Sequence, residues 1–312
     1  MSDNKEQKFF GVNDSLWGHK WGFKDSQFVI NDDGSVTFTG NRYKGVSGEN
    51  LPYLVPFVEK ILDIEIKTKP YFNEVEKKHV ADRSVNRHFM DELESNFNSD
   101  QYTFEDGDRI LHSHGQNGPD EVFKVLYNKL EKFTDLVFYI ESEQDVISLI
   151  DLAKKHDVCL VPFGGGTNVT NALKLPNEED RMIVSVDTRR MNKIESLDKE
   201  NLMVTVQAGI TGKILEENLQ KEGYTVGHEP DSIELSTLGG WISTNAAGMK
   251  KNRYGNIEDI VQNVIIITPN GSINQIEPLV RSSIGIKTQN LLFGSEGNLG
   301  IITKATLRMH KL

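Results

Sequence analysis

The sequence has almost no cysteine, no long apolar run and too few positive charges to balance its acidic residues. Cys159 is the only cysteine among 312 residues, so no disulfide can form within the chain, which suits a reducing compartment. No stretch approaches the roughly 18 apolar residues of a membrane-spanning helix, and the polar residues 1–10 are not expected to be a secretory signal. The net charge of −11 argues against a general binder of nucleic acid or anionic membranes.

A run of glycines follows an apolar segment near the middle of the chain. Residues 161–173 read VPFGGGTNVTNAL, and such bare backbone at a strand end indicates that something approaches the main chain closely. The loop either binds a phosphate through its amide N–H groups or is only a tight turn. These residues alone fit both interpretations. No residue of the stretch is charged, so a phosphate here would be held by amides alone.

The first hundred or so residues differ from the rest of the chain in their pattern of apolar and polar residues. Residues 21–43 alternate apolar and polar around Asp33-Gly34, which predicts a hairpin. Residues 51–64 have helical spacing, and residues 65–108 are charged and irregular, which predicts short helices and a connector. The length of the chain is enough for about two domains.

A regular alternation of strands and helices begins after about residue 123. Ser142 is predicted to cap a helix whose apolar face includes Val146 and Ile150, and Thr211 is predicted to cap another. Asn270-Gly271 predicts a second hairpin. The predicted strands lie within residues 135–140, 158–163, 182–187, 192–209 (two strands), 261–277 (the hairpin) and 300–309. Helices among hairpin-linked strands predict an α+β fold with mixed sheets rather than a purely parallel sheet.

Two further stretches are rich in small and polar residues. Residues 227–259 read GHEPDSIELSTLGGWISTNAAGMKKNRYGNIED and predict a long loop, of the kind that more often faces a ligand than serves structure alone. Residues 293–303 read FGSEGNLGIIT, with glycines at three-residue spacing; alone they would indicate only a turn before a strand. Cys159 lies in an apolar run, which favours a buried core cysteine over a nucleophile.

The three stretches together resemble the PCMH-type FAD-binding domain of the vanillyl-alcohol-oxidase superfamily, over about residues 129–311. The early GHKWGFKDSQF and TGNRY, with GYTVGHEPDSIELSTLGGWISTNAAGMKKNRYGNIEDIV, narrow the resemblance to the alkylglycerone-phosphate (alkyldihydroxyacetonephosphate) synthases. The resemblance implies a flavin domain of two α/β subdomains, at residues 129–311, after a smaller, mostly helical region at residues 1–128. The family's cap and C-terminal catalytic region would be absent.

The resemblance also implies a non-covalently bound FAD and the residues that hold it. The glycine loop would meet the pyrophosphate, the middle stretch would line the flavin ring and ribityl chain, and the last stretch would reach the adenosine half. The implied FAD-binding residues are Pro162, Phe163, Gly164, Gly165, Gly166, Thr167, Asn168, Asp231, Ser232, Ile233, Glu234, Leu235, Ser236, Thr237, Thr244, Asn245, Ala246, Ala247, Glu296, Gly297, Asn298, Leu299, Gly300, Ile301 and Ile302.

The family's reaction is the exchange of the acyl group of acyl-dihydroxyacetone phosphate for a long-chain fatty alcohol, through an adduct at flavin N5 and without net redox change. His228 is the candidate catalytic residue, because an imidazole beside the flavin stretch can exchange protons near neutral pH; a structural role is the alternative. His112 and His114 are weaker candidates, expected to point in opposite directions on a strand. The resemblance implies that the family's main catalytic residues lie beyond Leu312. No metal site is expected, since no third ligand is visible nearby.

The resemblance further implies a peroxisomal homodimer with peripheral membrane contact, and no nucleic-acid partner. The family is roughly twice as long, so the chain is either a fragment or a short relative, and by itself we expect it to be inactive or impaired. Two alternatives stay open at this point. One is an FAD-dependent oxidase or dehydrogenase of a hydroxy acid or alcohol, and the other is a non-catalytic remnant that partners a full-length synthase.

Overall fold

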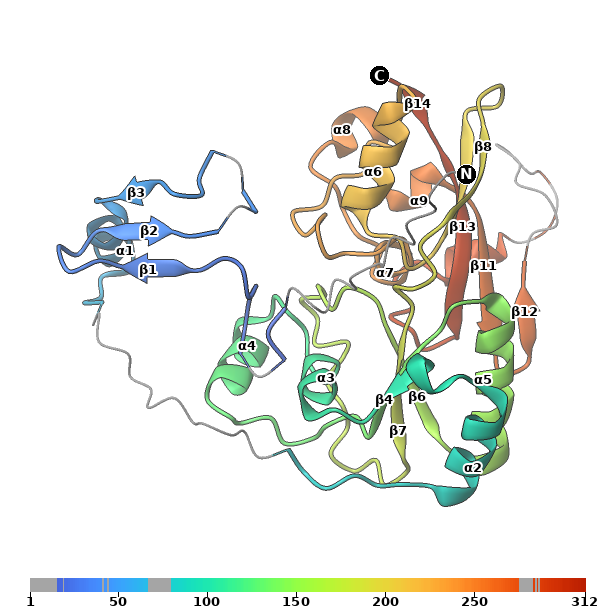
Figure 1. Cartoon of the computed structure of the whole chain (residues 1–312). Coiled ribbons are helices and arrows are strands. Elements are labelled where there is room, and N and C mark those ends of the chain that lie inside the picture. The colour runs from blue at the N-terminus through green and yellow to red at the C-terminus, as the bar shows by residue number, and fades with distance from the viewer. Residues whose placement is uncertain are drawn as a thin grey trace, which may run out of the picture.

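The computed structural model describes residues 16–18, 20–40, 42–43, 45–66, 80–274, 283, 285 and 287–312. Residues 1–10 therefore lie outside the described part, and so do residues 67–79 of the stretch 65–108 that was predicted to hold short helices and a connector. The chain begins with a small unit, drawn in blue at one side of Figure 1. Its elements are β1 (Phe28–Ile30), β2 (Val36–Phe38), β3 (Asn50–Leu51) and α1 (Leu54–Leu62). Ile30 pairs with Val36 across the turn, which confirms the predicted hairpin.

A four-stranded layer holds the first half of the main body. Its strands run in the order β4 (Tyr102–Thr103), β5 (Leu136–Tyr139), β7 (Ile183–Asp187) and β6 (Cys159–Phe163), and β5, β7 and β6 are parallel. Helix α5 (Glu143–His156) links β5 to β6 and begins at Ser142, whose hydroxyl accepts a hydrogen bond from Asp145 N, as predicted. Helix α2 (Arg87–Asn96) packs beside α5 in the same apolar core. Residues before 129 thus contribute a strand and a helix to this layer.

A five-stranded antiparallel sheet holds the second half. Its strands run in the order β12 (Gly271–Ile273), β11 (Val261–Thr268), β13 (Ile301–Arg308), β9 (Met203–Gln207) and β8 (Ile194–Asp198). Strands β11 and β12 pair around Asn270-Gly271, which confirms the second predicted hairpin. Three helices pack on this sheet (Figure 1): α6 (Gly212–Lys221), α7 (Leu238–Ser243) and α9 (Ile257–Ile260). They share one apolar core with it, and Trp241, which is 1% exposed, is part of that core.

Two sequence predictions differ from the structure. The stretch 227–259 is not one long loop but contains α7, α8 (Lys251–Tyr254) and α9, because Thr237 and Asn256 start short helices there. Thr211 does precede α6, but its side chain makes no capping hydrogen bond, since the residue is buried and bridged to Thr237. Among the described residues before 129, helices α1, α2, α3 (Asp106–Leu111) and α4 (Pro119–Leu126) hold more residues than the short strands β1 to β4, as expected of a mostly helical region.

The remaining short pair joins residues 310–311 to the end of α6. Strand β10 (Tyr224–Thr225) pairs with β14 (His310–Lys311), and Gly223, with φ +83°, turns the chain out of α6. None of the helices in the described ranges is both long enough and apolar enough to cross a membrane.

Candidate cofactor site

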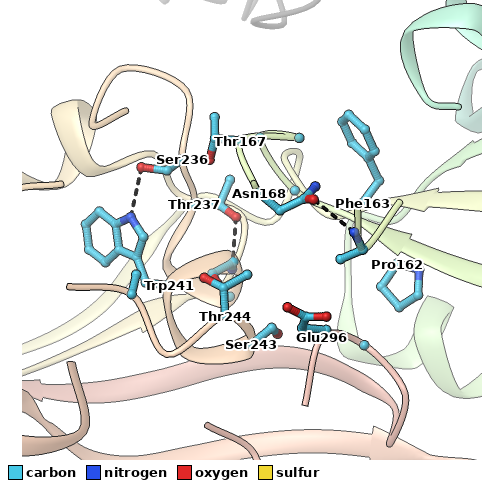
Figure 2. Close-up of a pocket in the computed structure, with 18 of the residues that line it drawn as sticks. Pro162, Phe163, Thr167, Asn168, Ser236, Thr237, Trp241, Ser243, Thr244 and Glu296 are labelled. Atoms are coloured by element: carbon cyan, nitrogen blue, oxygen red, sulfur yellow. Dashed lines mark hydrogen bonds between the residues drawn. The ribbon is translucent and has the colours of Figure 1, made fainter. Parts of the chain in front are cut away.

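A cavity of about 370 Å³ lies where the two sheets meet, at the carboxyl end of β6. Its walls come from three segments: the glycine loop after β6, the stretch around α7, and the turn before β13. Figure 2 shows Asn168, Thr237 and Glu296, one from each segment, around the same space. The topology thus brings together the three stretches that the sequence singled out. A crevice at the carboxyl ends of parallel strands is a common place for a ligand in α/β sheets.

The bare backbone of the glycine loop is first a packing requirement. A β-carbon at Gly164 would collide with Thr237 Oγ1, and one at Gly165 would collide with the carbonyl oxygen of Leu235. Gly166 has φ +67°, in the left-handed region that favours glycine. The interpretation of the loop as a tight turn is confirmed by its packing against residues 235–237. The loop also lines the cavity, so the phosphate interpretation stays a prediction.

The same loop offers donors that the protein leaves unused. Among the described residues, no acceptor pairs with the backbone N–H groups of residues 164–170. Unpaired amides on adjoining residues form a concave anion site. Asn168 does not add its side-chain oxygen to the groups open to a ligand, because its Oδ1 already accepts a hydrogen bond from Ala172 N at 3.0 Å.

The middle segment is fixed by two local hydrogen bonds. Thr237 caps α7 by accepting from Gly240 N at 3.3 Å, and the indole of the buried Trp241 donates to Ser236 Oγ at 2.8 Å (Figure 2). Small residues follow at Ala246 and Ala247, which also line the cavity. This wall therefore combines short polar groups with room for a flat ring.

The last segment carries the only ionisable side chain among the lining residues that the structure describes. Glu296, at φ +48°, accepts a hydrogen bond from Thr170 Oγ1 at 2.7 Å, so the turn before β13 closes onto the glycine loop. Gly297 packs on Pro162, where a β-carbon would lie 3.2 Å from the ring. The described lining has one carboxylate and no cation, so an anionic ligand would be held there by uncharged donors, namely backbone N–H groups and hydroxyl or amide side chains. The free amides of the glycine loop meet that condition, so the donor set fits the pyrophosphate of FAD.

A buried ion network supports the glycine loop from behind. His112 Nε2 lies 2.9 Å from Asp187 Oδ2, and Arg189 forms an ion pair with the same carboxylate. The ring centroids of His112 and Phe163 are 4.3 Å apart. Burial by itself would raise the pKa of Asp187, but Arg189 and His112 outweigh it and hold the pKa well below its ordinary value. His112 thus acts as a structural partner at the end of α3, and not as the strand residue that the sequence predicted.

His228 is buried outside the cavity. It is 1% exposed and packs edge-on against Trp241, with ring centroids 4.6 Å apart. Neither ring nitrogen finds a hydrogen-bond partner among the described residues. Burial lowers the pKa of His228 to about 4, so the imidazole is neutral at pH 7 and does not exchange protons near neutral pH in this state.

The other two candidates also have structural surroundings. His114 follows α3 and is 2% exposed, with Nδ1 2.7 Å from Gly115 O. Cys159 is half-buried, and burial raises the pKa of its thiol, as expected of a packing residue rather than a nucleophile.

Leu312, beyond which the resemblance places the family's main catalytic residues, is not itself part of the site. Its side chain is exposed, and it does not line the cavity. Its backbone N–H donates to Gly223 O at 3.1 Å, which continues the pairing of β14 with β10. Leu312 therefore has a structural role, and the location of the main catalytic residues stays a prediction.

Most implied FAD-binding residues line the cavity, but six do not. Four of the six are Asp231, Ile233, Glu234 and Leu235. Glu234 accepts a hydrogen bond from Tyr43, and the carbonyl of Leu235 packs against Gly165. The other two, Asn298 and Leu299, line a separate hollow beside α5. Eleven more residues line the cavity that the implied FAD-binding set does not include. Ten of them lie within the stretches 161–173 and 227–259, and the other, Thr188, is brought close only by the pairing of β6 with β7. These are Val161, Val169, Thr170, Ala172, Leu173, Thr188, Pro230, Gly239, Gly240, Trp241 and Ser243.

Comparison with known proteins agrees with this geometry. Residues 134–277 match the family model described as an FAD binding domain. An alkyldihydroxyacetonephosphate synthase of Caenorhabditis elegans is 39% identical over 289 residues, which are 93% of this chain and 48% of that protein. The synthase of Dictyostelium discoideum is 36% identical over 85% of this chain and 44% of its own length.

A solved structure is similar to this chain along nearly its whole length. An alkyldihydroxyacetonephosphate synthase crystallised in space group P1 superposes with a TM-score of 0.86 at 32% identity, over 97% of this chain and 55% of that one. The chain spans about half the length of these relatives. The family match and these similarities show that the chain has an FAD-binding domain of the PCMH type, with FAD as its cofactor. Along most of its length it is homologous to the alkyldihydroxyacetonephosphate synthases.

Proposed function

We propose that this chain is the flavin-binding part of an ether-lipid synthase. The reaction would replace the acyl group of acyl-dihydroxyacetone phosphate by a long-chain fatty alcohol, releasing a fatty acid without net redox change. The observation that carries this proposal is the reach of the similarity, which covers 93% of the chain and extends well beyond residues 134–277. FAD binding alone does not explain similarity of that reach, because the residues that line the cavity all lie between Val161 and Ile302.

The residues of the chain would hold and orient the cofactor. FAD supplies the reactive ring that loosens a C–O bond beside a ketone, while the protein supplies position and electrostatics. The free amides of residues 164–170 would take the pyrophosphate, and the small side chains Ala246 and Ala247 would leave room for the ring. Glu296, the one carboxylate among the described lining residues, would accept hydrogen bonds from uncharged hydroxyl or amino groups rather than face the phosphates.

A chimera tests this function. The 312 residues replace the matching part of the C. elegans synthase, and the product is assayed with palmitoyl-dihydroxyacetone phosphate and radiolabelled hexadecanol. We expect labelled alkyl-dihydroxyacetone phosphate and free palmitate in equal amounts. The matched control carries Gly165→Val, which places side-chain atoms against Leu235 and should abolish FAD loading and transfer together.

The two alternatives give different results in the same experiment. A chimera that holds FAD but transfers no alkyl group, and whose flavin is bleached by a 2-hydroxy acid, would mark a dehydrogenase. A chain that takes up no FAD but forms a stable complex with the intact synthase would mark a non-catalytic partner. Either result would refute the proposed reaction.

We also propose that the protein works in peroxisomes, as a homodimer with peripheral membrane contact. Support for the membrane contact comes from α1, in which no residue is buried and Phe57 and Ile61 are 60% and 61% exposed. Cosedimentation with phosphatidylcholine vesicles should be lost in a Phe57→Asp, Ile61→Asp variant. Light scattering and the location of a fluorescent fusion would check the dimer and the compartment.

A further inference from the structure

The turn between α3 and α4, residues 113–118, contacts the glycine loop at two of its carbonyl groups. The backbone N–H of Gln116 donates to Gly166 O at 2.6 Å. The side chain of Asn117 donates from Nδ2 to Thr167 O at 3.3 Å. Two consecutive carbonyl oxygens of the glycine loop therefore point toward this turn.

The direction of these carbonyl groups also sets the direction of two N–H groups. In a trans peptide unit the carbonyl oxygen and the N–H of the next residue point to opposite sides, and both units here are trans. The N–H groups of Thr167 and Asn168 therefore point away from the turn. Neither N–H finds an acceptor among the described residues.

The cavity lies on the other side of the loop from the turn. Gly166, Thr167 and Asn168 all line the cavity, whereas none of residues 113–118, every one of which the structure describes, lines it. The turn thus holds the loop from outside the cavity and leaves two adjoining N–H groups on the cavity side. Adjoining N–H groups of this kind bind an anionic oxygen.

The turn is itself held in place by residues outside it. The N–H of Gly115 donates to Oε1 of the buried Glu121 at 2.7 Å. The indole of Trp21 donates from Nε1 to Gln116 O at 2.7 Å, across 95 residues of sequence. The turn and Trp21 both lie before residues 134–277, which match the FAD binding domain. A part of the chain outside that match therefore fixes the carbonyl side of the glycine loop.

We propose that Asn117 and Trp21 are positioning residues, which turn two N–H groups of the glycine loop toward the pyrophosphate of FAD. Asn117 orients the N–H of Asn168 by binding Thr167 O. Trp21 orients the N–H of Thr167 by holding Gln116. The inference rests on FAD as the cofactor and not on the alkyl-transfer reaction, so a chimera that holds FAD but transfers no alkyl group would leave it untouched.

Dissociation constants of FAD, ADP and riboflavin from the purified chain test the proposal. ADP has the pyrophosphate without the flavin, and riboflavin has the flavin without phosphate. Asn117→Ala and Trp21→Phe each remove one neutral hydrogen bond, so each should weaken the binding of FAD and ADP about threefold. The double variant should bind both about tenfold more weakly, because the two residues act on different peptide units. Riboflavin should bind every variant within about twofold of wild type.

Two matched controls remove the same chemical groups from other hydrogen bonds. Asn201→Ala removes an exposed amide that donates to Asp198 at 2.8 Å, between β9 and β8. Trp17→Phe removes an indole that donates to Phe23 O at 3.1 Å. We expect both controls to keep the FAD affinity within about twofold of wild type.

The ratio of FAD affinity to riboflavin affinity separates positioning of the amides from general loosening of the fold, which would weaken all three ligands. FAD affinities of Asn117→Ala and Trp21→Phe that match wild type would overturn the proposal. An equal loss of riboflavin binding, or an equal loss of FAD binding in the controls, would overturn it as well. Circular dichroism checks that each variant folds, and the single variants decide alone if the double variant does not.

Discussion

At Gly165, the backbone of the glycine loop passes so close to Leu235 that a β-carbon would overlap the carbonyl oxygen. We expect Gly165→Ala to lower the free energy of unfolding by about 2 kcal/mol, as overpacking does, and to reduce FAD uptake. Gly107→Ala is the matched control. It lies in α3, and its β-carbon would be 3.9 Å from the nearest atom, so stability should change by less than about 1 kcal/mol. Equal melting temperatures for both variants would contradict this account of the loop.

His228 makes the stability of the folded chain depend on pH. Its ordinary pKa of 6.5 applies to the unfolded chain, whereas the folded chain binds the proton only near pH 4. Stability is therefore lost as the pH falls below about 6.5, at about 1.4 kcal/mol per pH unit. Between about pH 6.5 and 5 the loss should reach about 1.5 kcal/mol, and Gln at this position should remove it. Urea unfolding of wild type and His228→Gln at both pH values measures the difference; an identical pH dependence would refute the lowered pKa.

At the scale of elements, α5 covers the parallel strands that lead into the site. Its start depends on Ser142, which accepts from Asp145 N at 3.1 Å. Ser142→Ala should destabilise the chain by about 1 kcal/mol, measured by urea unfolding. Ser148→Ala, in the interior of the same helix, should be neutral or slightly stabilising because alanine is the better helix former. A larger effect at Ser148 than at Ser142 would show that the cap does not set the stability of α5.

Elements were predicted from the sequence far better than contacts between them. Alternating and apolar runs indicated the strands around Val184 and Val204, and the Ser142 cap and Asn270-Gly271 turn marked local boundaries, because these signals are short-range. The prediction for the stretch 227–259 was wrong because short helices such as α7 are stabilised by tertiary packing, here around Trp241, and carry too little periodicity to detect.

The site was predicted in its three segments but not in its connections. The resemblance named the glycine loop, yet the reason for Gly165 is its contact with Leu235, from a separate segment of the chain. Asp187 meets His112 across 75 residues, and Gln116 meets Trp21 across 95. Pairings of this kind arise only from the folded topology, so no pattern along the chain marks them.

At the scale of the whole molecule, a net charge of −11 surrounds a cavity whose described lining has one carboxylate and no cation. We expect this cavity nevertheless to hold the anionic cofactor, because backbone amides that find no acceptor among the described residues converge on it. Long-range electrostatics opposes binding, and short-range hydrogen bonds must outweigh it.

The most direct test is the visible spectrum of the purified 312-residue chain, with the chromophore identified after denaturation. The account predicts a flavin spectrum and released FAD close to one mole per mole of protein, either as purified or after incubation with FAD. A folded but colourless protein that added FAD does not occupy would contradict it.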